Sequence, residues 1–283
     1  MILKNNIINK YKNDKSFSNF IKDYFKIYNI QTSTNTSFEL FQQQKDFLEK
    51  INSEQFIVCK KSRQIGASKL LSAWILSESL FSNSSETIVY IGINGSIIND
   101  IRNQIIDFIE NLPLGIFNKD MTIPLIKKHN RQEIIFFNNV KILFKQIDNL
   151  DICGLSNVKA FVMEEIAFID NDKILKILNN IQHYILNNTK LIITSTPNSK
   201  NNLFNLLYKL NPTFSLDWWK DPRYNKDMIW IRNKDILIRF DNTTYDDLIE
   251  NGWKPSSPWY VKMCKSFNND SQKIAQELDN KFL

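Results

Sequence analysis

Histidine and cysteine are scarce in this chain, which has two histidines and three cysteines among 283 residues. Cys59, Cys153 and Cys264 lie far apart, outside any Cys-x-x-Cys pair and away from histidine at ligand spacing. This pattern excludes a disulfide framework and a structural zinc site, and it fits a reducing compartment. Because His129 and His183 are the whole histidine supply, a histidine-based metal site or catalytic triad is not expected either.

Long apolar runs are also missing. No stretch approaches the ~18 uninterrupted apolar residues that a membrane span needs. The opening Met-Ile-Leu-Lys-Asn-Asn lacks the apolar segment of a signal peptide. We therefore expect a soluble, unsecreted protein without a membrane partner. The apolar fraction of 43% is ordinary for a globular protein, and the net charge of +6 permits nucleic-acid contact without requiring it.

Residues 1–37 are rich in Asn, Lys and Ser and form an expected N-terminal extension. An apolar, mostly aromatic stripe within it recurs at helical spacing and predicts an amphipathic helix: Phe17, Phe20, Ile21, Tyr24, Phe25 and Tyr28. Such a stripe either docks on the core of its own domain, its usual fate, or binds a partner. The polar residues 31–37 are predicted to be a linker.

From Phe38 onward, short apolar runs alternate with helical segments, which predicts an α/β fold with a mostly parallel sheet flanked by helices. The expected central strands are residues 56–59, 87–93, 158–163 and 191–195. Residues 133–147 hold two strand-like runs around Asn138-Asn139, a pair typical of turns, and predict a hairpin insertion.

The composition of the chain changes after Pro212, where five of the six tryptophans lie among charged segments. We expect a core domain over residues 38–212 and a smaller subdomain over residues 213–283. These tryptophans are expected to pack within that subdomain; stacking on single-stranded bases is the alternative.

Residues 56–71 run from an apolar strand through a basic, polar turn into a helix. On the P-loop template Gly-x-x-x-x-Gly-Lys-Ser/Thr, Gly66 and Ser68 match, whereas Lys61 replaces the first glycine and Ala67 replaces the lysine. Backbone N–H groups around Gly66 and the helix N-terminus supply most of an anion cradle. The ammonium can therefore come from elsewhere, and whether Lys60, Lys61 or Lys69 supplies it stays open. The expected phosphate-binding residues are Lys60, Lys61, Ser62, Arg63, Gln64, Ile65, Gly66, Ala67 and Ser68.

A second apolar strand ends in Glu164 and Glu165. The carboxyl ends of parallel strands line the ligand crevice of an α/β sheet. Two acids at this position suit Mg²⁺ binding by the first and activation of the attacking water by the second. Glu164 stands where Asp is usual, and its extra methylene moves the carboxylate outward. An acid pair alone is also common at strand ends, but the P-loop upstream favours the functional interpretation.

Two further features accompany these motifs. The strand at residues 191–195 leads into the hydroxyls of Ser195 and Thr196, which can sense a γ-phosphate; an ordinary turn is the alternative. Gln44 precedes the P-loop strand, where helicase-like ATPases keep a glutamine that reads adenine. A solvated helix face is the alternative for Gln44.

Together, the segment from Lys61 to Ser68, the strand ending in Glu164-Glu165 and the strand ending at Pro197 resemble the ATPase of the large terminase subunit of tailed bacteriophages. The tail, residues 257–264 and 274–282, is similar to that family's connector between ATPase and nuclease. The resemblance implies a P-loop NTPase fold of the RecA/ASCE-like type with a small C-terminal lid or linker subdomain. The nuclease domain of the family is expected to be absent, because the chain stops about where that domain begins.

The same resemblance implies roles for individual residues. It makes Lys61 the displaced P-loop lysine, Arg63 a γ-phosphate contact and Glu165 the catalytic carboxylate. Ser68 and Glu164 become ligands of Mg²⁺, and Ser195 and Thr196 belong to a motif that couples hydrolysis to movement.

The implied function is an ATP- and Mg²⁺-dependent motor that drives double-stranded DNA into the procapsid in the host cell cytoplasm. The implied partners are the portal protein, the small terminase subunit and further copies of the chain in a ring. Two alternatives stay open: a helicase-like nucleic-acid ATPase, and a non-catalytic docking module, for which Ala67 and Glu164 are the evidence. Candidate DNA contacts, or simply solvated charges, are Lys127, Lys128, His129, Arg131, Lys262, Lys265 and Lys273.

Overall fold

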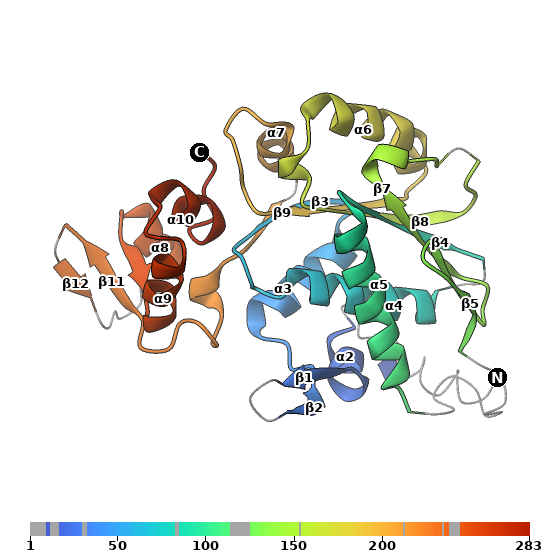
Figure 1. The fold of residues 1–283 in the computed structure, drawn as a ribbon, viewed down its shortest axis with the longest axis horizontal. Helices are drawn as coiled ribbons and strands as arrows, with labels where there is room; N and C mark the ends of the chain where they lie inside the picture. Colours follow the sequence, from blue (N-terminus) through green and yellow to red (C-terminus); the bar gives the residue numbers. More distant parts are fainter. Residues whose placement is uncertain are drawn as a thin grey trace.

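A sheet with helices on both faces forms the main body of the computed structural model, and a smaller unit lies beside it (Figure 1). The structure describes residues 10–11, 17–29, 33–82, 85–113, 125–152, 154–211, 213–233, 235–237 and 244–283. Cys153 and Pro212 lie outside these residues. Among the helices in the described ranges, none has both the length and the apolar character needed to cross a bilayer.

The main sheet has eight strands in the order β10-β3-β9-β8-β4-β7-β6-β5. Their bounds are β3 Phe56–Lys61, β4 Thr87–Gly92, β5 Ile126–His129, β6 Glu133–Phe136, β7 Lys141–Gln146, β8 Val158–Glu164, β9 Lys190–Ser195 and β10 Thr213–Leu216. From β10 through β7 all neighbours pair in parallel. The predicted mostly parallel sheet is therefore confirmed.

The hairpin predicted around Asn138-Asn139 is present, because β6 and β7 pair in antiparallel fashion and Asn139 takes a positive φ of 64° at the turn. Its description as an insertion is wrong. Strand β7 pairs in parallel with β4, with Val89 opposite Leu143, so the hairpin extends the central sheet. Ile142 and Phe144 of β7 are buried in the same core as Ile88 and Tyr90 of β4.

Helices cover both faces of the sheet (Figure 1). One face carries α3 Gln42–Ser53, α4 Ala67–Phe81 and α5 Gly95–Glu110, and the other carries α6 Asn171–Leu186 and α7 Leu203–Leu210. Every residue of β4 is buried, and its side chains alternate between two cores. Ile88 and Tyr90 belong to the first core, and Val89 and Ile91 belong to the second.

The N-terminal extension packs against the first core, but not as the single helix that was predicted. Helix α2, Ser18–Tyr24, is followed by strand β1, Lys26–Asn29, and strand β2, Thr34–Ser37, which pair in antiparallel fashion. The predicted linker at residues 31–37 therefore contains a strand; residues 31 and 32 lie outside the described ranges. Phe25 is fully buried and stacks on Phe108 of α5 with ring centroids 4.8 Å apart, whereas Tyr28 is 61% exposed.

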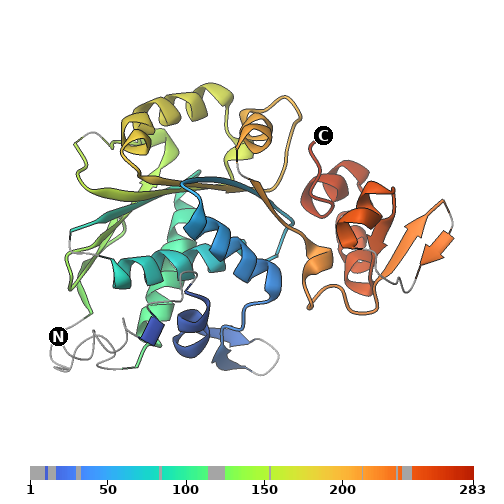
Figure 2. The ribbon, with the colours of Figure 1, turned by 180° about the vertical axis from the view of Figure 1, so that it is seen from behind.

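The smaller unit follows β10, which belongs to the main sheet, so its boundary lies after Leu216 and not at residue 213. It holds strands β11 Ile229–Arg232, β12 Asp235–Leu237 and β13 Lys254–Ser256, with helices α8 Tyr245–Glu250, α9 Pro258–Ser266 and α10 Ser271–Glu277 (Figure 2). Trp218, Trp219 and Trp230 are buried in its own core. The tryptophans therefore pack as expected.

Replacing Phe25 with alanine is expected to lower the free energy of unfolding by about 3–5 kcal/mol, because the cavity lies inside the core. Tyr28→Ala removes a largely exposed ring from the same aromatic stripe and is expected to cost about 0.5 kcal/mol or less. Urea denaturation followed by tryptophan fluorescence measures both. Equal costs for the two variants would contradict the packing of the extension.

Candidate functional site

The loop between β3 and α4 has the backbone of an anion cradle. Gln64 and Gly66 both take positive φ values, 61° and 81°, and α4 begins directly afterwards at Ala67. The N-cap residue of α4, Gly66, offers no side chain to the first turn of the helix. The N–H groups of this turn and the helix dipole therefore favour a phosphate.

Lys61, which is buried, and Glu165, whose side chain is 21% exposed, form an ion pair at the carboxyl edge of the sheet. Burial alone would lower the pKa of Lys61, but the neighbouring carboxylates of Glu165 and Glu164 outweigh burial and raise that pKa above its ordinary value. The side chain is therefore an ammonium. Glu165 follows β8 in a left-handed conformation, with φ of 60°, which is strained for a residue other than glycine.

The second oxygen of Glu165 faces the end of β9. It accepts hydrogen bonds from the backbone N–H of Thr196 at 3.3 Å and from the Thr196 hydroxyl at 3.3 Å. The Ser195 hydroxyl lies 3.4 Å from the same oxygen, but its proton has a closer acceptor in the Thr196 carbonyl at 2.8 Å. The structure thus brings both predicted hydroxyl residues to the second acid of the pair. The carboxylate is fixed between a cation on one side and neutral donors on the other.

Glu164 is 1% exposed, and both of its carboxylate oxygens have partners. Ser68 donates to Oε1 at 2.5 Å, and the Tyr90 hydroxyl donates to Oε2 at 2.9 Å. Burial raises the pKa of Glu164, and burial together with Glu164 raises that of Tyr90, so the phenol stays protonated and donates. Tyr90 was not predicted. Its one signal in the sequence is a tyrosine in an otherwise aliphatic buried strand, where a hydroxyl needs a partner.

Lys60 lies on the opposite face of β3. Its ammonium donates to the backbone carbonyl of Asn280 at 3.2 Å and lies 5.3 Å from the centre of the Tyr208 ring. Successive side chains of a strand point to opposite faces, so Lys60 and Lys61 cannot serve the same site. The geometry favours Lys61 as the phosphate-binding lysine.

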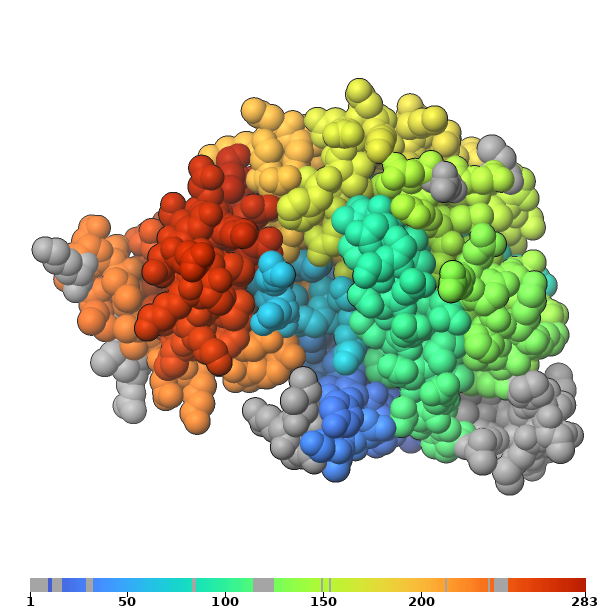
Figure 3. Space-filling model, in the orientation of Figure 1, coloured from blue at the N-terminus to red at the C-terminus, as the bar shows by residue number. Residues whose placement is uncertain are grey.

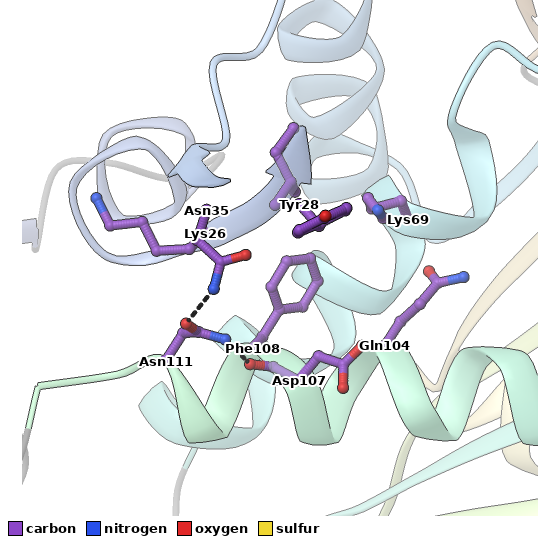
Figure 4. A pocket seen from close by; sticks show the side chains of 9 residues that line it. Lys26, Tyr28, Asn35, Lys69, Gln104, Asp107, Phe108 and Asn111 are labelled. Atoms are coloured by element: carbon purple, nitrogen blue, oxygen red, sulfur yellow. Dashed lines mark hydrogen bonds between the residues drawn. The ribbon is translucent and has the colours of Figure 1, made fainter. Parts of the chain in front are cut away.

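Lys69 turns toward a different pocket, shown in Figure 4. This cavity of about 250 Å³ lies between β1, β2, α4 and α5, and its lining includes Tyr28, Phe108 and Asp107. None of the residues from Lys60 through Ser68 lines it. Lys69 is therefore not placed with the acid pair.

Ser62 and Arg63 face the C-terminal segment. The fully buried Ser62 hydroxyl donates to the carbonyl of Leu278 at 2.8 Å. The backbone N–H of Arg63 donates to the Glu277 carbonyl at 2.7 Å, and its guanidinium lies 3.5 Å from the Glu277 carboxylate. The predicted γ-phosphate arginine is thus paired with Glu277 in this structure.

Gln44 is buried, and its amide donates to the Ile65 carbonyl at 3.4 Å. Of its two neighbours, Gln43 bonds to the backbone of Asp217 and Gln42 bonds to Asp46, so Gln44 is the glutamine beside the loop. Arg223 was missed by sequence reasoning. Its guanidinium pairs with the buried Asp221 at 2.5 Å and donates to the Ile65 carbonyl at 3.3 Å. It lies 5.4 Å from the ring centre of Phe41 and 4.9 Å from that of Tyr224.

The donor set at Ser68 and Glu164 fits Mg²⁺. A hydroxyl and a carboxylate oxygen meet there, and hard oxygen donors are what this ion prefers. Within the described ranges no group of three or more His, Cys, Asp or Glu side chains forms a metal cage. Mg²⁺ commonly binds through one or two protein ligands plus phosphates and water, so the small donor set suits a metal that arrives with a nucleotide.

The basic cluster before the hairpin lies on the exposed edge strand β5 and the turn after it. Arg102 of α5 joins it, because its guanidinium donates to the Asn130 carbonyl at 2.8 Å and approaches His129 at 3.4 Å. Lys128 is paired with Glu133 at 2.6 Å. The other predicted basic residues, Lys262, Lys265 and Lys273, are exposed on α9 and α10.

A protein-family model and several solved structures match this chain. The model of the T4likevirus-type large terminase subunit, N-terminal region, matches residues 58–255. The HK97 bacteriophage large terminase is 12% identical, with a TM-score of 0.63 over 95% of this chain and 55% of that chain. The Thermus phage P74-26 large terminase ATPase domain is 13% identical, with a TM-score of 0.54 over 87% of this chain and 95% of that chain. A mutant of that domain scores 0.56 over the same coverage.

These structural likenesses show the fold, and this chain spans about half the length of the HK97 protein. No curated protein sequence matches the chain.

Lys61→Met is expected to lower ATP affinity roughly 10- to 100-fold, the worth of a charge-assisted hydrogen bond. Lys60→Met removes the adjacent ammonium from the other face of β3 and is expected to leave that affinity unchanged. Isothermal titration with ATP and Mg²⁺ measures both. A larger loss in the Lys60 variant would contradict the assignment.

Proposed function

Because the chain belongs to the T4likevirus-type large terminase family, whose N-terminal model matches residues 58–255, we propose that it is an ATPase motor domain that moves double-stranded viral DNA into the procapsid. The observation that carries the proposal is the convergence of Lys61, Ser68, Glu164 and Glu165 beside an anion-binding loop. The fold also matches 95% of the P74-26 ATPase domain.

Each of these residues has a distinct task in ATP hydrolysis. When ATP binds, the Lys61 ammonium exchanges the Glu165 carboxylate for the phosphates. The exchange is possible because carboxylate and phosphate are both oxygen anions and the ammonium already lies at the loop. Glu165 is then free to accept a proton from the attacking water, while the backbone N–H and hydroxyl of Thr196 keep its other oxygen in place. Ser68 and Glu164 would hold Mg²⁺, which neutralises charge on the phosphate oxygens when it is bound.

Arg63 has a task in this scheme that depends on movement. Its guanidinium pairs with Glu277 and must release this carboxylate before it contacts a γ-phosphate. A guanidinium at that position would stabilise the charge that develops during transfer. If Arg63 exchanges Glu277 for a phosphate, α10 loses this contact, and the nucleotide state is thereby connected to the C-terminal unit.

The partners follow from the motor function. The basic edge at β5 and the lysines of α9 and α10 offer sequence-independent contacts to DNA phosphates, which predicts binding that weakens as salt rises. We propose the portal protein, the small terminase subunit and further copies of the chain in a ring as the other partners, in the host cell cytoplasm. The non-catalytic alternative is disfavoured, because Lys61 and both acids are in place at the loop. The family match disfavours the helicase alternative.

Mg²⁺-dependent ATP hydrolysis by the purified chain tests the proposal. Glu165→Gln is expected to lower turnover roughly 100-fold or more while ATP binding persists, because the base is lost and the phosphate contacts remain. Glu39→Gln, at a glutamate 65% exposed in its side chain, is the matched control and is expected to retain full turnover.

Double-stranded DNA is expected to stimulate hydrolysis, with the effect decreasing at higher salt. Unchanged turnover in the Glu165 variant would contradict the catalytic assignment. Turnover indifferent to DNA in an assembled ring would contradict the motor.

A further inference from the structure

The carboxylate of Glu164 has hydrogen-bond partners on both of its oxygens, although binding a metal ion requires only one of them. Its side chain is almost entirely buried, and each oxygen accepts a hydrogen bond from a different element of the fold. Ser68 at the start of α4 occupies Oε1, and Tyr90 of β4 occupies Oε2. The contact with Ser68 belongs to the nucleotide site described above, whereas the contact with Tyr90 has no role there.

Strand pairing explains how Tyr90 reaches Glu164. Strands β4 and β8 are parallel neighbours with Tyr90 opposite Val162, so Glu164 lies two residues further along on the same face. The phenol ring spans this step and places its hydroxyl 2.9 Å from Oε2. Tyr90 itself is fully buried, and its ring centroid lies 6.3 Å from that of Phe144 on β7.

Gly92 leaves room for this arrangement. It lies two residues after Tyr90 on β4, and a Cβ atom at Gly92 would lie 3.3 Å from Cε1 of the tyrosine ring and 2.7 Å from Ile98. A larger residue would therefore press on the ring that carries the hydroxyl.

We infer that Tyr90 is a positioning residue for the metal site: its hydroxyl fixes Oε2 of Glu164 and thereby points Oε1 toward Ser68 and Mg²⁺. The inference rests on the proposed function, because it concerns the same metal. Glutamate has one more side-chain torsion than the aspartate usual at this position, and an unanchored carboxylate would lose more conformational freedom on binding the ion. The hydrogen bond from Tyr90 removes that freedom in advance, as groups behind metal ligands commonly do.

Binding of Mn²⁺ in the presence of ADP, followed by electron paramagnetic resonance of the free ion, tests the inference without hydrolysis. Tyr90→Phe keeps the ring and is expected to weaken Mn²⁺ binding roughly 10-fold or more, while ADP affinity without metal stays unchanged.

The matched control is Tyr184→Phe, which removes another buried hydroxyl that donates to the Ile152 carbonyl at 2.9 Å in the core on the other face of the sheet. It should leave Mn²⁺ binding unchanged. Normal Mn²⁺ affinity in the Tyr90 variant, or an equal loss in both variants, would overturn the inference. Absence of Mn²⁺ binding by the unsubstituted chain would overturn the proposed function and this inference with it.

A double-mutant cycle separates positioning from a general loss of packing. In the Glu164→Asp background the shorter carboxylate cannot reach both Ser68 and Tyr90, so the further change Tyr90→Phe is expected to have little effect on Mn²⁺ affinity. Coupling of this kind supports a direct hydrogen bond between the two side chains. Equal effects of Tyr90→Phe in both backgrounds would contradict it.

Discussion

The ion pair between the buried Lys61 and the partly exposed Glu165 is the interaction on which the arrangement of the site depends. Strands β3 and β8 are not neighbours, because β9 lies between them, so the pair bridges the end of the intervening strand. The backbone N–H and hydroxyl of Thr196, which follows β9, donate to the other oxygen of Glu165. Without the Glu165 carboxylate, the buried Lys61 ammonium would lack a charged partner until it contacts the phosphates. The pair thus keeps an ammonium ready beside the anion-binding loop.

Because successive side chains of β3 point to opposite faces of the sheet, its two lysines have different surroundings. Lys61 faces the acid pair, while Lys60 faces α7 and the C-terminal segment. Ser62 and Arg63, which follow them, also bond to residues 277 and 278. The loop that would hold the phosphates is therefore connected directly to the last residues of the chain. A change of loop conformation on nucleotide binding would have to break or move these contacts, which gives the C-terminal unit a way to respond.

Much of the fold and site could be predicted, because the signals are local. Apolar runs located β3, β4, β8 and β9, and the order of lysine, glycine and acids located the loop and the pair. Features that depend on distant partners could not be predicted. The strand within residues 31–37 exists because β1 pairs with it. Strand β7 belongs to the main sheet because it pairs with β4. Tyr90 and Arg223 gain their roles from neighbours 74 and 158 residues away in the chain.

A crystal structure of the chain with Mg²⁺ and a slowly hydrolysed ATP analogue tests the central claim most directly. The account predicts that the triphosphate lies on the loop around Gly66, with the Lys61 ammonium moved from Glu165 to its oxygens. The metal should contact Ser68, with Glu164 beside it. A triphosphate bound elsewhere, or one contacted by Lys60 or Lys69 while Lys61 stays paired with Glu165, would contradict the account.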